Sequence, residues 1–181
     1  MVNRSDAFLV EGVLNGDRSA FGDLYDRYAR LVRSICYDAT QDMTGAQDLS
    51  QEVFLRAYSK LGELRDPDRF AGWLVGIVRM VCREWRRRRG RDRHTYVDVV
   101  PDAPDAGRST PSDERINRLH EAMRSLPERE RLALHTFYLN GESVGAVRQV
   151  LGLSQSGVYR LLDRARRRLK GCLQDRQEDG A

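Results

Sequence analysis

The sequence predicts an all-α protein made of two small helical domains joined by a flexible linker. Apolar residues recur at steps of three and four along most of the chain, and no segment shows the alternation of a β-strand. One central segment is acidic and rich in proline. We therefore place the domains at residues 1–93 and 114–175, with the linker at 94–113.

The first domain is expected to contain four helices. An opening helix over roughly 7–14 is followed by apolar stripes within 24–35, 49–61 and 70–85, of which the last is the strongest. Ser19 is the expected N-cap of the helix that carries the 24–35 stripe.

The linker differs in composition from both of its neighbours. It contains Pro101, Pro104 and Pro111 among several aspartates. Proline removes backbone donors, and so few apolar residues cannot offset the entropy lost on ordering. A spacer is the expected role.

The second domain begins with a helix marked by the apolar stripe within 116–126. Pro127 then stands where a first-turn proline belongs, and Asn140-Gly141 ends the next helix. The residues expected to face inward from that helix are Leu132, Leu134, Phe137 and Tyr138.

The segment that follows is typical of a helix-turn-helix. A short helix over 143–151 precedes the turn Gly152-Leu153-Ser154, in which Gly152 can adopt a positive φ and Ser154 can cap the second helix. The polar face of that second helix could enter a major groove, although an ordinary helical hairpin also turns at glycine. Its candidate DNA-binding residues are Ser154, Gln155, Ser156, Tyr159, Arg160 and Arg164.

The basic residues are clustered, although the formal net charge is only +4. One block lies within 86–93 and the other within 164–170. Concentrated positive charge attracts polyanions and favours nucleic acid as a partner, whereas the alternative interpretation is a solvated helix face.

Several classes of protein are not indicated. Cys36, Cys82 and Cys172 are far apart and show no metal-ligand spacing, so we expect buried thiols, no metal and no cofactor. No nucleophile–base set or paired acid accompanies the carboxylates, so we expect no enzyme. No stretch has the apolar run of a signal peptide or a membrane span, so we expect a cytoplasmic protein without membrane insertion.

Four blocks resemble the extracytoplasmic function (ECF) type of sigma factor, a small two-domain class. The first is Asp48-Leu-Ser-Gln-Glu-Val-Phe-Leu-Arg-Ala-Tyr58, and the second is the apolar segment from Phe70 to Arg79, which a basic run follows. The others are Leu126-Pro-Glu-Arg-Glu-Arg131 and Leu151-Gly-Leu-Ser154. They stand in the family's order and spacing.

The resemblance implies that the partners are bacterial RNA polymerase core and promoter DNA. The helix of the first block would dock on the polymerase clamp helices through Asp48, Gln51, Glu52, Leu55 and Arg56. The helix-turn-helix residues would recognise the −35 element as a duplex.

The resemblance further implies that the loop at 65–69 and the helix after it recognise the −10 element as a single strand. An unstacked base would be held in a pocket, and arginines would bind phosphates. The candidate residues are Arg65, Asp66, Arg69, Phe70, Arg79, Met80, Arg83, Arg86 and Arg87.

Three positions depart from the family pattern in ways that affect DNA specificity. Met80 stands where the family usually has an asparagine, and a thioether is a poor hydrogen-bonding group for a base. Arg148 replaces a small alanine and Leu161 replaces a basic residue in the helix-turn-helix. We expect altered base preference at −10 and −35.

A further departure concerns the start of the polymerase-binding helix. The family's acidic Asp-Ala-Glu-Asp is here Gly45-Ala46-Gln47-Asp48, so two negative charges are missing, and Thr44 comes immediately before. We hypothesise that phosphorylation of Thr44 restores about −1.5 to −2 charge units and promotes polymerase binding; alternatively, Thr44 caps the helix. Regulation is left open between a Ser/Thr kinase and an anti-sigma factor.

The alternative function is that of a helix-turn-helix regulator that binds duplex DNA without core polymerase. That interpretation leaves the block at 48–58 unexplained.

Overall fold

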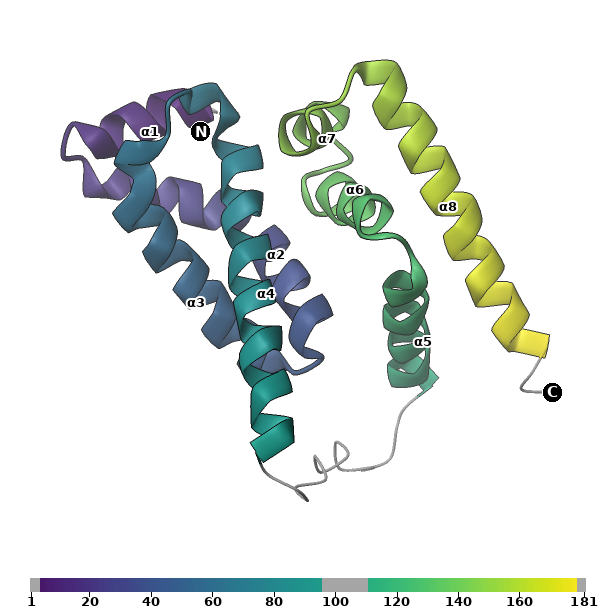
Figure 1. Ribbon diagram of the computed structural model, residues 1–181. Helices are drawn as coiled ribbons and strands as arrows, with labels where there is room; N and C mark the ends of the chain where they lie inside the picture. Colours follow the sequence, from purple (N-terminus) through teal and green to yellow (C-terminus); the bar gives the residue numbers. More distant parts are fainter. Residues whose placement is uncertain (1–3, 96–110, 179–181) are drawn as a thin grey trace.

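The structure is a computed structural model that describes residues 4–95 and 111–178, with side chains described for 4–90 and 114–174 (Figure 1). These residues form helices only, so the predicted all-α class is confirmed. Most of the predicted linker, residues 96–110, lies outside the described residues. The helices are α1 (Asp6–Leu14), α2 (Arg18–Thr40), α3 (Met43–Lys60), α4 (Phe70–Thr95), α5 (Pro111–Ser125), α6 (Glu128–Leu139), α7 (Val144–Leu151) and α8 (Gln155–Glu178), with 3-10 turns η1 (Leu61–Glu63) and η2 (Pro67–Arg69).

The first bundle packs α1–α4 around one apolar core. The three predicted stripes supply that core, because residues such as Leu24, Val53 and Leu74 have no exposed surface. The N-cap of α2 is Asp17 rather than the predicted Ser19, whose backbone N–H instead donates to Asp17 Oδ1 at 2.9 Å. The helix therefore begins two residues earlier than predicted, and the Asp17 carboxylate satisfies an amide of its first turn.

A buried carboxylate ties α1 to α2. Asp6 is buried and accepts hydrogen bonds from the Tyr28 hydroxyl and the Arg27 guanidinium. Burial first, and then the negative charge of Asp6, raises the pKa of Tyr28 far above its ordinary value. The polar contact fixes the otherwise short α1 against the bundle.

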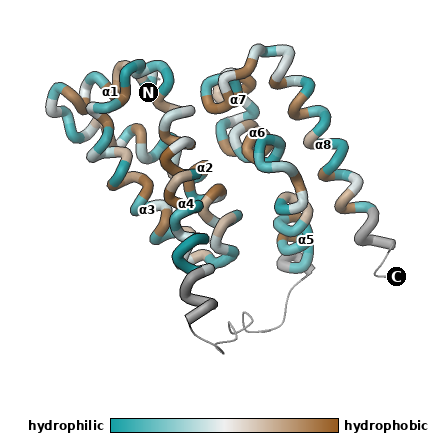
Figure 2. Tube along the Cα trace, viewed as in Figure 1, coloured by the Kyte–Doolittle hydropathy of each residue, from teal (hydrophilic) through white to brown (hydrophobic). Residues whose placement is uncertain are grey.

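The second bundle packs α5–α8 around Ala133, Leu134, Val147, Val158 and their neighbours. Figure 2 shows hydrophobic residues along α6 and α7, and Val147 of α7 and Val158 of α8 are buried in one core with α6. Tyr138 was expected to face inward, but 52% of it is exposed. It lies at the end of α6, where its ring packs edge-on against Phe137 and its hydroxyl accepts from Arg166.

The two bundles contact each other directly, with α6 against α2 and α7 against α4 (Figure 1). Leu132 and Val150 from the second bundle are buried together with the core of the first. At Gly72 of α4 a β-carbon would lie 3.2 Å from the backbone oxygen of Gln149, so glycine permits this close approach.

Among the described residues, no helix has the length and hydropathy needed to cross a membrane.

Candidate nucleic-acid and protein interfaces

Helix α3 presents one face to the core and the opposite face to solvent. Ala46, Leu49, Val53 and their neighbours on the inner face are buried. The predicted polymerase-binding residues lie on the other side: Asp48, Gln51 and Leu55 are exposed, Leu55 to 72%, and Glu52 and Arg56 are half-buried. An exposed leucine surrounded by polar side chains resembles the apolar centre and polar rim of protein interfaces.

Two of these residues are already engaged within the chain. Arg56 pairs with Glu52 on its own helix and with Glu84 of α4 at 2.8 Å, and Arg88 lies 3.6 Å from Glu84. The hydrogen bond from Arg56 and the neighbouring arginines lower the pKa of Glu84, while Glu84 and Glu52 raise the pKa of Arg56. This network fixes the edge of α3 to α4 and holds Glu52 and Arg56 in place.

The first turn of α3 is capped by Asp42, whose Oδ2 accepts from Gly45 N at 2.6 Å. Thr44 is therefore not the cap, and its side chain is exposed in that turn. The capping role considered for Thr44 is wrong, because Asp42 already satisfies the amide.

The nine predicted −10 residues lie in three different settings. Arg65, Asp66 and Arg69 are exposed before α4, with Arg69 paired to Asp66 at 3.1 Å, and Asp66 also caps η2. Arg87 is exposed on α4 and makes no ion pair with a carboxylate whose side chain is described.

Phe70 requires a correction. It has no exposed surface and packs against the rings of Tyr28 and Trp73, at 5.6 and 5.8 Å between centroids. Phe70 cannot contact DNA in this structure, because it is the first residue of the apolar stripe of α4 and its side chain packs in the core. Met80 is half-buried and packs on the same core.

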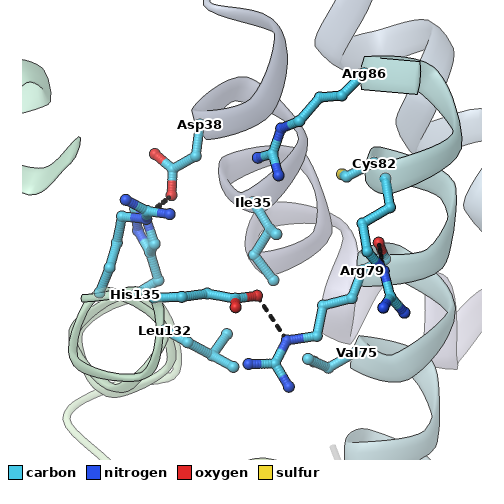
Figure 3. Close-up of a pocket in the computed structure, with 11 residues that line it drawn as sticks. Ile35, Asp38, Val75, Arg79, Cys82, Arg86, Leu132 and His135 are labelled. Carbon is cyan, nitrogen blue, oxygen red and sulfur yellow. Dashed lines mark hydrogen bonds and ion pairs between the residues drawn. The ribbon is translucent and has the colours of Figure 1, made fainter. Parts of the chain in front are cut away.

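The remaining three residues, Arg79, Arg83 and Arg86, face the second bundle. They line a cavity of about 390 Å³ between α2, α4 and α6 (Figure 3). Arg79 pairs with Glu128 of α6 at 2.8 Å. A surface predicted to bind single-stranded DNA is thus turned toward the other bundle.

A second set of ion pairs lies on the opposite wall of the cavity. Asp38 of α2 contacts Arg131 at 2.8 Å and His135 at 3.0 Å, and only 7% of its side chain is exposed. A buried carboxylate requires such partners. We call Asp38, Arg79, Glu128, Arg131 and His135 the interdomain cluster.

The helix-turn-helix has the predicted geometry. Gly152 has φ +63°, and Ser154 Oγ accepts from Gly157 N at 3.2 Å. Gln155, Ser156, Tyr159 and Arg160 are exposed along the start of α8.

Arg164 lies on the same helix but pairs with a carboxylate of α6. Its Nε donates to Glu130 of α6 at 2.8 Å, and Arg168 approaches the same carboxylate at 3.3 Å. Glu130 is 3% exposed, so this pairing satisfies a buried charge and ties α8 to α6.

Comparison with known proteins agrees with this architecture. The family models for Sigma-70 region 2 and Sigma-70 region 4 match residues 24–92 and 116–169. The ECF RNA polymerase sigma factor BldN of Streptomyces coelicolor is 32% identical over 92% of this chain, and SigW of Bacillus subtilis is 24% identical over 92%. The chain belongs to the ECF family of sigma factors.

The relatives differ in length. The chain spans 42% of the probable RNA polymerase sigma factor RfaY of Xanthomonas campestris, to which it is 29% identical over 89% of its own length. It spans 65% of BldN and 95% of SigW.

Two solved structures share the fold. The structure of CnrH in complex with the cytosolic domain of CnrY has a TM-score of 0.64 at 23% identity, and covers 95% of this chain and 99% of CnrH. The sigma factor RpoE of Bartonella quintana, solved with the anti-sigma factor NepR, has a TM-score of 0.53 at 20% identity. The match covers 84% of this chain and 97% of the RpoE chain.

Sequence analysis missed the interdomain cluster of this ECF sigma factor. Asp38 lies on α2, Arg79 on α4 and the other three members on α6, and no local spacing brings these three distant segments together. A local signal is the Leu126–Arg131 block, a motif of the family resemblance that contributes Glu128 and Arg131 to the cluster.

Proposed function

We propose that this ECF sigma factor binds core RNA polymerase in the cytoplasm and directs it to promoters. The first bundle would supply polymerase docking and −10 recognition, and the second would supply −35 recognition. The observation that carries the proposal is the ordered match to sigma-70 regions 2 and 4 across both bundles. The exposed face of α3 and the exposed start of α8 support it.

Docking on polymerase would use Asp48, Gln51 and Leu55 directly, because all three are exposed and Asp48 makes no ion pair with a described side chain. Glu52 and Arg56 would act through the network with Glu84 or after rearranging it. The exposed Leu55 is the apolar centre of this surface.

Recognition of −10 DNA would require the bundles to separate. Arg79, Arg83 and Arg86 face α6, and Arg79 is paired across the interface. We propose that the described arrangement is a closed state and that polymerase binding favours an open one, since a partner shifts an equilibrium toward the state it binds better.

Run-off transcription with purified bacterial core tests the function. The chain should produce specific transcripts whose starts define −10 and −35 elements, and core alone should not. A gel shift separates the alternative, because a regulator would bind its duplex site without core. Absence of specific transcripts, or a specific shift by the chain alone, would contradict the proposal.

An anti-sigma factor is the regulating partner that the RpoE–NepR complex supports by analogy. Such a partner would hold the bundles closed or cover the exposed face of α3. A protein that co-purifies with the chain and suppresses run-off transcription is the expected result, and one that leaves transcription unchanged would not fit.

Phosphorylation of Thr44 remains a separate hypothesis. Thr44 is exposed in the first turn of α3, where a phosphate would interact favourably with the helix dipole and replace the missing acidic charge. Polymerase affinity should be higher for Thr44→Glu than for Thr44→Ala. Equal affinity of both variants and the unmodified chain would end the idea.

A further inference from the structure

The cavity between the bundles carries more positive charge than its carboxylates balance. Besides His135, the charged side chains that line it are four arginines and two carboxylates: Arg79, Arg83, Arg86, Arg131, Asp38 and Glu128. Four positive and two negative charges leave a net charge of +2 before His135 is counted. An excess of positive charge concentrated in a cleft raises the local concentration of small anions.

The ion pairs of the interdomain cluster leave two of the four arginines without a carboxylate. Glu128 and Asp38 each bind one of the other arginines at 2.8 Å. Arg83 donates from its Nε to a backbone oxygen at 3.2 Å, and Arg86 makes no hydrogen bond or ion pair with the described residues. The remaining N–H groups of Arg83 and Arg86 are therefore available to an acceptor that enters the cavity.

The two available arginines lie close together on α4. They are three residues apart, so they share one face of the helix, and both line the cavity. Figure 3 shows Arg86 extending from α4 toward the α2 side of the cavity. Guanidinium groups bind phosphate through paired hydrogen bonds, and a phosphate monoester carries about −1.5 to −2 charge units near neutral pH. A phosphoryl group therefore matches both the donors and the excess charge.

Three aliphatic side chains also line the cavity, one from each of its three helices. Ile35 comes from α2, Val75 from α4 and Leu132 from α6, and Val75 and Leu132 are almost fully buried. The cavity volume of about 390 Å³ lies within the range of about 300–1,000 Å³ that is typical of small-molecule sites. A ligand that fits this lining has an apolar body as well as a phosphoryl group.

We propose that the cavity between the bundles binds a small organic phosphate, a compact molecule with one phosphoryl group and an apolar body. The phosphoryl group accepts hydrogen bonds from Arg83 and Arg86, and the apolar body contacts Ile35, Val75 and Leu132. Because the walls of the cavity come from both bundles, the bound molecule favours the closed arrangement over an open one. Binding needs neither polymerase nor promoter DNA, so it does not depend on the proposed function.

Calorimetric titration of the full chain with phenyl phosphate tests the proposal, because this probe joins a phosphoryl group to a small apolar ring. We expect saturable binding of one molecule per chain. Phenol, which lacks the phosphoryl group, should not bind at the same concentrations. Inorganic phosphate, which lacks the ring, should bind about tenfold or more weakly, since it buries no apolar surface. No binding of phenyl phosphate, or equal affinities for phenyl phosphate and inorganic phosphate, would overturn the proposal.

Substitutions on α4 locate the phosphoryl group. Arg83→Ala and Arg86→Ala should each weaken phenyl phosphate binding about tenfold or more, since each removes a charged hydrogen-bond donor. Arg89→Ala is the matched control, because Arg89 is an exposed arginine of the same helix that does not line the cavity. It removes the same charge and should leave the affinity within about twofold. Circular dichroism checks that each variant stays helical, and equal losses for all three variants would contradict the site.

Methyl NMR shows whether the ligand lies between the bundles. In the full chain with isotope-labelled methyl groups, nuclear Overhauser effects from the phenyl ring should reach both Val75 of α4 and Leu132 of α6, which line opposite parts of the same cavity. This measurement requires no substitution, so it does not depend on the stability of a variant. Effects limited to one bundle, or to methyl groups outside the cavity, would overturn the proposal.

Discussion

The start of α8 and the middle of α4 carry the same kind of residue but differ in availability. Arg160 is exposed and makes no ion pair among the described side chains, whereas Arg79 is paired across the bundles and Arg86 faces the same cavity. Both surfaces were predicted to bind DNA from residue type and helical spacing. The difference shows that an arginine's neighbours in space, rather than in sequence, decide whether it can meet a phosphate.

The largest effect is expected from Phe70→Ala at the start of α4. Removing a fully buried aromatic side chain should lower the free energy of unfolding by about 3–5 kcal/mol. Urea unfolding followed by tryptophan fluorescence measures it, because both tryptophans, Trp73 and Trp85, lie on α4. Arg69→Ala is the control, with an expected change within about 0.5 kcal/mol. Comparable values for the two variants would mean that Phe70 is not a core residue.

Asp38→Ala should separate the two bundles and so make the arginines of α4 as available to DNA as those at the start of α8. It removes the carboxylate that pairs with Arg131 and His135 at the interface. The free energy that holds the two bundles together should fall by about 2–3 kcal/mol. Small-angle scattering should show a larger radius of gyration. Asp163→Ala is a matched control, since Asp163 is exposed and pairs with Arg167 away from the interface. An unchanged radius for Asp38→Ala would show that the cluster does not hold the bundles together.

Arg160→Ala sharpens the comparison from the side of α8. Loss of one contact to a base edge or phosphate should weaken promoter binding by the polymerase complex by about 1–2 kcal/mol. The measurement is a binding titration at fixed salt, with Arg167→Ala as the control. The loss of promoter affinity caused by Arg160→Ala should be the same with and without Asp38→Ala. The loss caused by Arg86→Ala should be larger in the Asp38→Ala background. If Asp38→Ala changed both affinity losses equally, the two arginines would not differ in their availability to DNA.

The smallest effect is expected at the far end of the α4 surface, in the Glu84–Arg56 pair. The pKa of Glu84 is lowered from its ordinary value of 4.5, so its contribution is present above that value and is lost as pH falls through the lowered pKa. Because 35% of the Glu84 side chain is exposed, that contribution should be only a few tenths of a kcal/mol. Unfolding free energies of the unmodified chain and Glu84→Gln should converge as pH falls below about 4. A difference that grows on acidification would contradict this sign.

Much of the fold follows from local pattern. The stripes that begin at Leu24, Leu49 and Phe70 lie in the core, and Gly152 and Ser154 form the predicted turn and cap. Helical periodicity and turn chemistry involve only residues close in sequence, so the sequence alone could indicate them. The exposed positions of Gln155 and Leu55 follow from the same periodicity.

Errors arose where one residue satisfied two patterns. Phe70 stands both at the edge of the predicted DNA-binding loop and at the start of the strongest apolar stripe, and packing determined its place. Tyr138 continued the periodicity of α6 but lies at its end, where the helix meets solvent.

The sequence by itself determined the helices, the two bundles, the helix-turn-helix and the family, because each rests on short-range spacing or on blocks in a fixed order. Only the tertiary structure decided that Arg79 pairs with Glu128 and that Asp38 pairs with Arg131 and His135. These contacts join residues of different helices, and their formation depends on how whole helices pack, which no local pattern records.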